Sequence, residues 1–352
     1  MNIKITGTGS YIPSKIATNE TFHNHEFLNT DGTSIKAPNE VIVKKFKAIT
    51  GIDERRYAKN HLNTSDLASF AAEKAIESAK INREELDYII VAHNYGDVRH
   101  DSIQSDTVPS IASRVKHLLQ IKNPKCVAYD LLFGCPGWVQ GVIQAQAFIK
   151  AGIANKCLVI GAETLSRILD PHDRDSMIYS DGAGAVVIEN TNDEGGIITH
   201  DSATFALDEA HYIFFGETNN QNSNDQRRYI KMYGRKIYEF ALTNVPVAMK
   251  SCLDKSGIDI TQVKKILIHQ ANEKMDEAIV KRFYELYNME MPRGIMPMSI
   301  GKLGNSSVAT VPTLYDIILK GNLENQEINK GDVILFASVG AGMNINAIVY
   351  KQ

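Results

Sequence analysis

Three side chains able to take part in covalent catalysis stand where the sequence predicts the ends of secondary-structure elements. Cys135 lies within residues 130–138, between a strand pattern and a helix pattern. His269 ends a buried apolar run, and Asn305 lies in a Gly-rich turn that precedes another helix pattern. A cysteine nucleophile with a histidine is a recognised pairing for covalent catalysis. Each residue also has a structural interpretation: a small core cysteine, a structural histidine or a helix-capping asparagine.

The turn around Cys135 has the composition of a tight strand-to-helix connection. Gly134 and Gly137 permit a sharp turn, and Pro136 suits the first turn of a helix, where its missing N–H costs nothing. Residues 139–151 contain no helix breaker and no charge before Lys150, so the helix is expected to be buried on every side. The thiol would then lie at the positive end of a helix, where a lowered thiol pKa is expected.

Composition sets the broad class of the protein. The chain has 352 residues, of which 43% are apolar and 22% charged, as in ordinary globular proteins with two domains or two fused halves. The net charge of −3 gives no support to a nucleic-acid partner. The N-terminus lacks a signal-peptide pattern, and no run approaches the length of a membrane span. The four cysteines show no disulfide or CxxC spacing, so reduced thiols in the cytoplasm are expected.

Strand patterns alternate with helix patterns along the chain, which predicts an α/β protein with substantially parallel sheets. The polar segment 190–196 is the best linker, and the element order before it recurs after it, as in an internal duplication. The predicted halves are residues 1–192 and 193–352. Helices are predicted over 41–49, 65–79, 110–119, 139–151, 233–254, 272–287 and 307–320. Strands are predicted over 3–9, 88–92, 126–130, 157–161, 181–188, 266–269, and in a closing hairpin of 333–338 and 344–350.

Two polar segments superficially resemble metal sites. His23 and His25 lie in a polar loop without accompanying Cys or carboxylate ligands, and residues 170–175 carry consecutive charges of alternating sign. A solvated loop and a hydrogen-bonded loop explain these segments better than a metal does. The Gly182-Ala-Gly184 sequence by itself is a weak nucleotide signal, and no GxGxxG is present. No metal site is therefore predicted.

Six motifs in a fixed order resemble one family of enzymes. They are residues 7–13 (GTGSYIP), the Cys135 turn, 181–185 (DGAGA), 269–272 (HQAN), 304–307 (GNSS) and 340–342 (GAG). Together they resemble β-ketoacyl-acyl-carrier-protein synthase III, the chain-initiating condensing enzyme of type II fatty-acid synthesis. The resemblance covers essentially the whole chain. It implies the thiolase-like fold, five αβαβα layers built from two duplicated halves, and a homodimer.

The resemblance also implies roles for the three reactive residues. Cys135 would be the acylated nucleophile, and His269 and Asn305 would serve the decarboxylation of malonyl carrier protein by donating to an enolate oxygen. The backbone N–H groups of Cys135 and Ala341 would form the oxyanion hole. The implied partners are an acyl carrier protein and an acyl primer carried by CoA or by a carrier protein. Neither chemical step needs a redox cofactor, a nucleotide or a metal.

Further residues are placed by the same resemblance. The thioester arm would contact Arg174, Gly234 and Asn272, and Val108 would line the acyl pocket of the partner subunit, where its small size favours primers longer than acetyl. A basic face of the helix after His269 would dock the carrier protein through Lys274, Lys281 and Arg282. The chain departs from the family at Pro136, which follows the nucleophile, at Lys274 in place of arginine, and at Lys45 and Ile49, where a Trp and an Arg commonly hold the adenine of CoA.

Two other enzyme classes remain open at this point. A specialised condensing enzyme that makes a β-ketone, quinolone or resorcinol-type product would share every catalytic residue. The order Cys, His, Asn also occurs in papain-like proteases. This chain lacks the Cys-Gly-Ser-Cys-Trp type of motif of those proteases and carries His-Gln-Ala-Asn instead.

Overall fold

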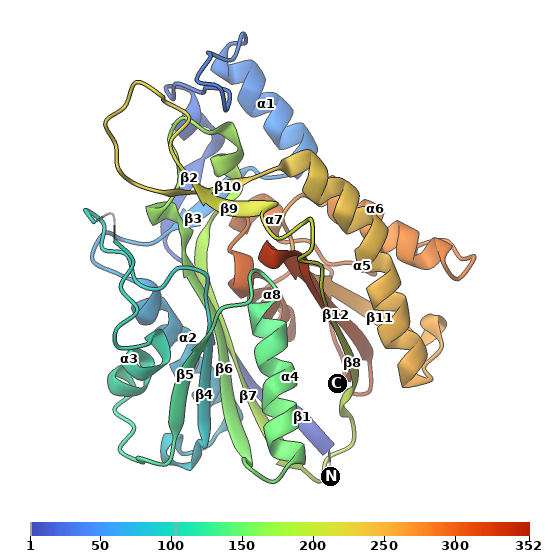
Figure 1. Ribbon diagram of the computed structural model, residues 1–352. Helices are drawn as coiled ribbons and strands as arrows, with labels where there is room; N and C mark the ends of the chain where they lie inside the picture. Colours follow the sequence, from blue (N-terminus) through green and yellow to red (C-terminus); the bar gives the residue numbers. More distant parts are fainter. Residues whose placement is uncertain (1, 103) are drawn as a thin grey trace.

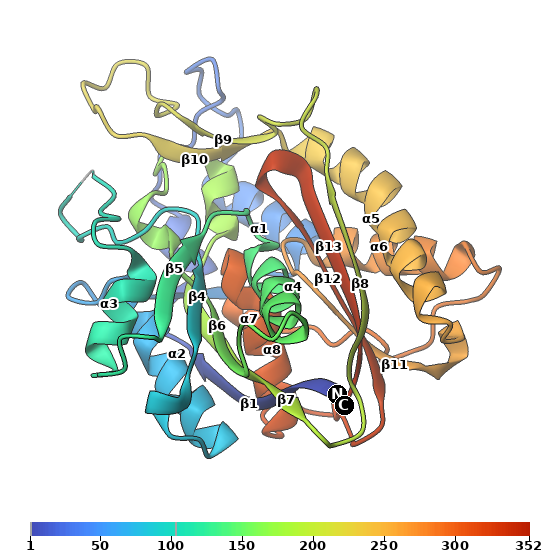
Figure 2. The ribbon, with the colours of Figure 1, turned by 60° about the horizontal axis from the view of Figure 1, so that its bottom comes forward.

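The chain folds into five alternating layers of helices and sheets. A computed structural model describes residues 2–102 and 104–352. Met1, and Ile103 in the polar loop expected between the second strand and its following helix, lie outside the described residues. Figures 1 and 2 show two sheets with a pair of helices between them and further helices on both outer faces.

The first sheet has five strands in the order β1-β7-β6-β4-β5. β7 pairs antiparallel with β1 and with β6, whereas β4 pairs parallel with both β6 and β5. The expected parallel character therefore holds for the β6-β4-β5 part of the sheet. The strands are β1 (Asn2–Tyr11), β4 (Tyr88–Ala92), β5 (Val127–Leu131), β6 (Lys156–Thr164) and β7 (Asp181–Thr191).

The second sheet repeats four of these strands in order and direction. Its order is β8-β13-β12-β11, in which β13 pairs antiparallel with β8 and β12, and β12 pairs parallel with β11. These directions match those of β1-β7-β6-β4, so the duplication expected from the element order is present in the sheets. The closing hairpin is β12 with β13, as expected. The strands are β8 (Gly196–Thr204), β11 (Val263–Ile268), β12 (Val333–Gly340) and β13 (Asn344–Lys351).

Three apolar cores hold the layers together. α4 (Gly137–Lys150) and α8 (Thr310–Leu319) lie between the sheets, in a core that includes Trp138, Tyr315 and Phe336. The charge-free helix after Cys135 is thus covered by sheets on two sides, which explains its composition. The expectation of burial on every side was wrong, because Ala147 is exposed and Phe148 is half-buried. One outer layer consists of α2 (Thr64–Ala79) and α3 (Ile111–Leu118), and the other of α5 (Gly234–Ser256) and α6 (Glu273–Glu285).

Short elements cover one end of this core, where the active-site cavities lie. These elements are β2 (Lys15–Thr18), α1 (Asn39–Thr50), β3 (Glu54–Tyr57), β9 (Ile213–Gly216), β10 (Tyr229–Met232) and α7 (Ile300–Leu303). β9 and β10 pair as a two-stranded ribbon, which runs across the upper part of Figure 1 and was not expected from the sequence. Two 3₁₀ segments also matter to the site: η6 (Ser307–Ala309) and η7 (Ala341–Met343).

The connection between β7 and β8 separates the two sheets in the sequence. Every strand of the five-stranded sheet precedes residue 192, and every strand of the four-stranded sheet follows it. We propose residues 1–192 and 193–352 as the two halves on this ground. None of the helices within 2–102 and 104–352 has the length and apolar character needed to cross a membrane.

Candidate active site

Cys135 lies on a turn between β5 and α4, where two backbones approach closely. Gly134 has a φ of 66°, a left-handed conformation that favours glycine. A Cβ on Gly134 would fall 2.7 Å from the Ala341 N, and one on Gly340 would fall 2.4 Å from the Cys135 N. The β12–β13 turn therefore packs directly against the nucleophile turn. This contact explains why both segments are rich in glycine.

The three reactive residues predicted from the sequence line one cavity. Cys135, His269 and Asn305 are all among the walls of a cavity of about 240 Å³. Cys135 is partly accessible, whereas Cys126, Cys157 and Cys252 are buried. The remaining wall is mostly apolar and includes Phe214 and Phe215 of β9 and Ile230 and Met232 of β10. A thiol, an imidazole and an amide thus face a small apolar chamber.

The thiol pKa differs from the sequence-based expectation. Burial raises the pKa of Cys135 to about 11, and the charge of Glu163 acts in the same direction. A hydrogen bond from Ser307, whose Oγ lies 3.3 Å from the Cys135 Sγ, acts in the opposite direction. The prediction of a lowered pKa was wrong for the free site, because desolvation disfavours the thiolate. A reaction that uses the Cys135 thiolate would therefore have to move this proton.

His269 is neutral at physiological pH. Burial lowers its pKa to about 4, although a hydrogen bond with the Ser307 backbone acts in the opposite direction. Its Nδ1 is buried and has no hydrogen-bond partner among the described residues. The ring lines the cavity, and a neutral imidazole carries one N–H donor and one acceptor nitrogen.

Asn305 is oriented by its own turn. Its Oδ1 accepts a hydrogen bond of 2.8 Å from the Ser307 N–H, and its backbone bonds on both sides to the segment before β7, at Ile178 and Ser180. Because the Oδ1 already accepts this hydrogen bond, the Nδ2 hydrogens of Asn305 are the groups that can donate to a ligand. The asparagine is 4% exposed, so any such ligand must enter the cavity.

The two backbone N–H groups predicted as an oxyanion hole lie on the touching backbones. Ala341 lines the cavity with Cys135, and its N lies close to Gly134 as described above. Neither N–H donates to another backbone group in the described turns and loops. Two free N–H groups beside a thiol suit an anionic oxygen that develops on a carbon bonded to that sulfur.

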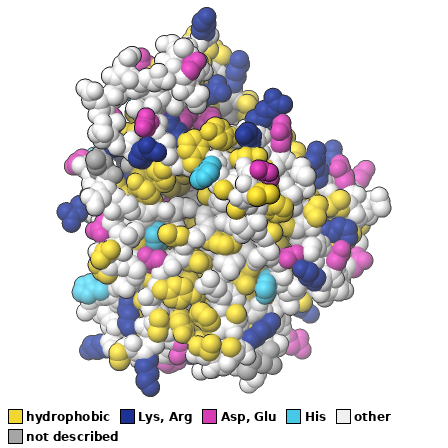
Figure 3. Space-filling view, in the orientation of Figure 1, with side chains coloured by type: hydrophobic (Ala, Val, Ile, Leu, Met, Phe, Trp, Pro, Cys, Tyr) yellow, Lys and Arg dark blue, Asp and Glu magenta, His cyan; other side chains and the backbone are white. Residues whose placement is uncertain are grey.

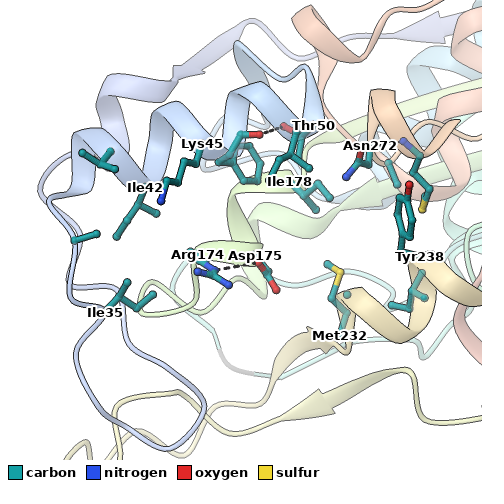
Figure 4. Close-up of a pocket in the computed structure, with 18 residues that line it drawn as sticks. Ile35, Ile42, Lys45, Thr50, Arg174, Asp175, Ile178, Met232, Tyr238 and Asn272 are labelled. Carbon is teal, nitrogen blue, oxygen red and sulfur yellow. Dashed lines mark hydrogen bonds and ion pairs between the residues drawn. The ribbon is translucent and has the colours of Figure 1, made fainter. Parts of the chain in front are cut away.

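A second cavity leads from the surface to the first. It has a volume of about 380 Å³ and shares Ile178, Met232, Ile237, Ala271 and Met275 with the inner cavity. The predicted arm-binding residues Arg174, Gly234 and Asn272 all line it, as do Lys45 and Ile49. Figure 4 shows Lys45 and Arg174 on opposite walls of this cavity, with Asn272 farther along it, away from Ile35 and Ile42.

The polar residues of this entry cavity also have structural partners. The Asn272 side chain caps α6 by accepting a hydrogen bond of 3.1 Å from the Met275 N. The Arg174 Nε lies 3.7 Å from the Asp175 Oδ1, and burial raises the pKa of that carboxyl. The Asn272 amide hydrogens and the guanidinium edge of Arg174 remain the groups that a ligand could meet.

The remaining predicted residues lie outside both cavities. Val108 is 86% exposed and lines neither cavity of its own chain, as expected for a residue that would serve a partner subunit. Lys274 and Lys281 lie along a groove of α6 together with Glu277 and Glu285. Arg282 instead donates a hydrogen bond of 3.1 Å to the Leu242 carbonyl, so part of its guanidinium serves the contact between α5 and α6.

Three polar residues near the thiol were missed by the sequence analysis. Ser307 and Asn94 line the inner cavity, and Glu163 is buried beside them at the end of β6. Ser307 lay within a motif that was noticed but received no role. Glu163 follows six buried residues of β6, and a carboxyl group at the end of a buried strand was a signal that could have singled it out.

Metal ligands are not clustered in the described part of the chain. No group of three or more His, Cys, Asp or Glu side chains there could hold a metal ion. The charged segment 170–175 instead surrounds a buried lysine: the Lys231 Nζ donates to Asp170, to Asp173 at 3.0 Å and to the Asn219 Oδ1 at 2.8 Å. The expectation of a hydrogen-bonded loop is confirmed.

Comparison with known proteins agrees with the geometry. Family models described as 3-oxoacyl-[acyl-carrier-protein (ACP)] synthase III and its C-terminal part match residues 129–205 and 253–352. Beta-ketoacyl-[acyl-carrier-protein] synthase III 1 of Vibrio vulnificus is 32% identical over 97% of both chains. The enzyme of that name from Bacillus cereus is 30% identical over 100% of this chain and 99% of that one.

Solved structures give the same result for the fold. The 3-oxoacyl-[acyl-carrier-protein] synthase III of Aquifex aeolicus has a TM-score of 0.81 at 29% identity, over 99% of this chain and 100% of that one. The Thermus thermophilus synthase III has a TM-score of 0.82 at 28% identity, over 99% of both chains. The priming ketosynthase of the R1128 polyketide pathway shares the fold at 22% identity.

The duplicated five-layer fold and its Cys, His and Asn cavity define a thiolase-like condensing enzyme. Within that class, the chain belongs to the 3-oxoacyl-[acyl-carrier-protein] synthase III family and is an acyltransferase.

Proposed function

We propose that this enzyme joins an acyl primer to malonyl carrier protein by decarboxylative Claisen condensation, through an acyl group carried on Cys135. The observation that carries the proposal is the single cavity lined by Cys135, His269 and Asn305. Those three groups supply a nucleophile and two neutral donors. The product would be a 3-oxoacyl thioester on the carrier protein.

The first half-reaction is acyl transfer to sulfur. The Cys135 Sγ attacks the thioester carbon of the primer, and the N–H groups of Cys135 and Ala341 stabilise the oxyanion. The leaving thiol departs through the entry cavity with its pantetheine arm. The water-poor, apolar walls protect the acyl-cysteine from hydrolysis.

The second half-reaction uses the free donors of His269 and Asn305. Malonyl thioester loses CO₂, and the enolate oxygen that forms accepts hydrogen bonds from the neutral imidazole and from the Asn305 amide. The low pKa of His269 suits this role because a neutral ring donates without leaving a buried positive charge. The enolate carbon then attacks the acyl carbon, the bond from that carbon to the Cys135 sulfur breaks, and the Cys135 thiolate takes up a proton. None of these steps calls on a redox or nucleotide cofactor, and we propose that none is used.

The entry cavity suits a phosphopantetheine arm. Lys45 and Arg174 offer positive charge on its walls, and its inner part is apolar up to the thiol. The Trp and the Arg that commonly hold adenine in the family are absent from α1, where Lys45, Phe46 and Ile49 line the cavity. The phosphopantetheine arm is common to CoA and to a carrier protein, whereas adenine belongs to CoA alone. A cavity that suits the arm and lacks the usual residues for adenine favours a primer delivered by a carrier protein.

A homodimer fits the surface of the chain. Val108, Leu132 and Leu207 are 86%, 66% and 94% exposed, which is unusual for apolar side chains of this size. Figure 3 shows apolar side chains gathered over the middle of one face, with most of the charges around its rim. We propose that a second copy covers this face and that the enzyme acts in the cytoplasm.

Acyl mapping tests the proposal most directly. The enzyme is incubated with acyl-carrier-protein or acyl-CoA primers, digested, and searched by peptide mass for the acyl group. Label at Cys135, lost in Cys135→Ser, is expected, whereas label at Cys126, Cys157 or Cys252 alone would refute the proposal.

The two half-reactions are then separated by variants. His269→Ala and Asn305→Ala should still accept the acyl group on Cys135 and should lose malonyl decarboxylation by about 10²-fold or more. A variant that decarboxylates normally but fails to acylate would overturn these roles. Product masses with malonyl carrier protein distinguish a 3-oxoacyl product from the β-ketone, quinolone or resorcinol of a specialised condensing enzyme.

A further inference from the structure

A chain of hydrogen bonds joins the thiol of Cys135 to a buried carboxyl group. The Ser307 Oγ lies 3.3 Å from the Cys135 Sγ, and the Asn94 Nδ2 donates to the Ser307 Oγ at 2.8 Å. The same Asn94 amide donates to the Glu163 Oε1, which also accepts the Asn94 backbone N–H at 3.1 Å. Four segments far apart in the sequence thus meet at this point.

Glu163 is not explained by packing alone. It is 1% exposed, and no Lys or Arg pairs with it among the described residues. A buried carboxyl without a cationic partner is costly to ionise. Burial accordingly raises the pKa of Glu163 to about 8, with Asp181 acting in the same direction and Asn94 and Ser307 opposing it.

The titratable groups around Glu163 leave few other proton acceptors. Asp181 of β7 accepts hydrogen bonds from Ala58 and Ser166, and burial raises the pKa of Tyr179 well above its ordinary value. His93 at the end of the neighbouring strand faces Asp130, with 3.0 Å between the Nε2 and Oδ2 atoms. Among these groups, Glu163 is the carboxyl that hydrogen bonds through Asn94 and Ser307 connect to the thiol.

We propose that Glu163 receives the proton of the Cys135 thiol through the Ser307 hydroxyl during acylation. The inference rests on the proposed function, because it concerns the step in which Cys135 attacks a thioester. Asn94 would hold the oxygens of Ser307 and Glu163 in place by donating one hydrogen bond to each. Glu163 and Asn94 are positioning and proton-transfer residues in this scheme, and they need not touch the substrate.

The relay depends on the single hydroxyl proton of Ser307. That hydroxyl lowers the pKa of both Cys135 and Glu163, and its Oγ accepts from the same Asn94 Nδ2 as the Glu163 Oε1 does. When the thiol proton moves to the Ser307 Oγ, the original hydroxyl proton moves to the Glu163 carboxylate. The new hydroxyl then donates to the thiolate, so the same side chain stabilises both ends of the transfer.

The complete acylation step balances without a further reactant. The sulfur electron pair of Cys135 forms the bond to the acyl carbon, and the bond from that carbon to the leaving sulfur breaks. The leaving thiolate takes one proton, which Glu163 returns along the same path or through entering water. Glu163 ends the step ionised, as it began.

His269 is the alternative acceptor, and the structure disfavours it. Burial lowers the pKa of His269 to about 4, whereas that of Glu163 is raised to about 8. A proton leaving the thiol is therefore held far more strongly by Glu163. A base whose pKa lies near the working pH is also the most effective general base.

The test is the pH dependence of Cys135 reactivity in wild type and Glu163→Gln, with glutamine keeping the oxygen that accepts from Asn94. Iodoacetamide alkylation reports the thiolate, and acylation by a thioester reports the reaction, both read by peptide mass. In wild type both rates should rise with pH through about 8. In the variant that rise should disappear, and both rates near neutral pH should fall by about tenfold or more.

A purely electrostatic neighbour would give the opposite sign. The charge of Glu163 raises the pKa of Cys135, so its removal would make the thiol more acidic and faster to react near neutral pH. Faster labelling in Glu163→Gln, or an unchanged pH profile, would overturn the proposal.

Two further variants separate the relay from stability. Ser307→Ala breaks the path while leaving Glu163 in place, and it should lose the same rise of rate with pH. Asp276→Asn is the matched control, because Asp276 is also a fully buried carboxyl with a raised pKa but has no hydrogen-bond path to Cys135 among the described residues. The pH dependence of Cys135 labelling and acylation in Asp276→Asn should equal that of wild type, even if the melting temperature falls. A pH dependence altered as much as in Ser307→Ala would overturn the relay.

The outcome is distinguishable from a failure of the proposed function. If wild-type Cys135 is alkylated but accepts no acyl group from any thioester, the proposed function fails. The alkylation profiles of Glu163→Gln and Ser307→Ala still decide whether the thiol proton reaches Glu163.

Discussion

Gly340 lies against Cys135 so closely that a Cβ on the glycine would fall 2.4 Å from the Cys135 N and 2.8 Å from its Cβ. The φ of Gly340 is −170°, an extended value that any residue adopts, so the constraint is space and not backbone conformation. Through this contact the last hairpin of the second sheet fixes the nucleophile turn of the first. The proposed oxyanion hole would depend on the same contact, because its two N–H groups lie on the two backbones.

Gly340→Ala should therefore impair both stability and acylation. The methyl group meets backbone atoms that cannot rotate away, so one of the turns must shift, at a cost of about 1–3 kcal/mol. We expect a lower melting temperature and a loss of acyl transfer to Cys135 larger than the loss of iodoacetamide labelling, since the oxyanion donors are displaced. Gly182→Ala is the control: its Cβ would meet its nearest neighbour at an ordinary 3.5 Å, and wild-type acylation would be retained.

His269 should make the protein less stable in acid. Its folded-state pKa is about 4, below the ordinary value of 6.5, so the unfolded chain takes up a proton first as the pH falls. The stabilising contribution is complete above pH 6.5 and is lost as the pH falls through 4, by up to about 3 kcal/mol. Urea unfolding of wild type and His269→Gln between these two values should show a shallower pH dependence in the variant. Parallel curves would contradict the burial of a neutral imidazole.

Carrier-protein docking on α6 should depend on Lys274 and Lys281. An acidic carrier would be steered by these exposed lysines, although Glu277 and Glu285 of the same groove reduce the local positive charge. The double charge reversal Lys274→Glu, Lys281→Glu should raise the KM for malonyl carrier protein several-fold, more so at low salt, and leave acylation by small thioesters unchanged. Lys330→Glu, before β12 and at the far end of that strand from the cavity, is the control. An unchanged KM would place the docking surface elsewhere.

Arg282 should behave differently from the two lysines, although all three were predicted on one face. Its hydrogen bond to the Leu242 carbonyl links α6 to α5. Arg282→Glu is therefore expected to lower stability by about 1 kcal/mol as well as to alter docking. Chemical unfolding of the single variants separates the two effects.

Val108 should set the length of the primer if a second copy completes the acyl pocket. A small side chain leaves space for several methylenes, each of which favours binding by about 0.8 kcal/mol at most, or roughly 3 kcal/mol for four carbons. The ratio of kcat/KM for octanoyl and hexanoyl primers to that for acetyl should be high in wild type and fall in Val108→Phe. Ile153→Phe, exposed beyond the far end of α4, should keep the wild-type ratio. A wild type limited to acetyl would rule out this pocket.

The sequence by itself determined the reactive groups and the elements that carry them. Glycine and proline around Cys135 dictate a tight turn, and a helix without charge before its last residue is expected to be buried, as most of α4 is between the two sheets. His269 and Asn305 were recognised because each ends an apolar run or follows a Gly-rich turn. These are local properties, written in residues a few positions apart, and so they can be read without the fold.

Only the tertiary structure decided what surrounds the thiol. The β9–β10 ribbon that walls the cavity carries too few residues to have a distinct pattern, and it is placed by contacts with distant segments. The raised pKa of Cys135 reflects burial by segments distant in the sequence, which no local motif encodes. The path from Cys135 through Ser307 and Asn94 to Glu163 joins four separate segments. It exists because the ends of β4, β5 and β6 meet at one edge of the first sheet, where η6 of the second half packs against β6.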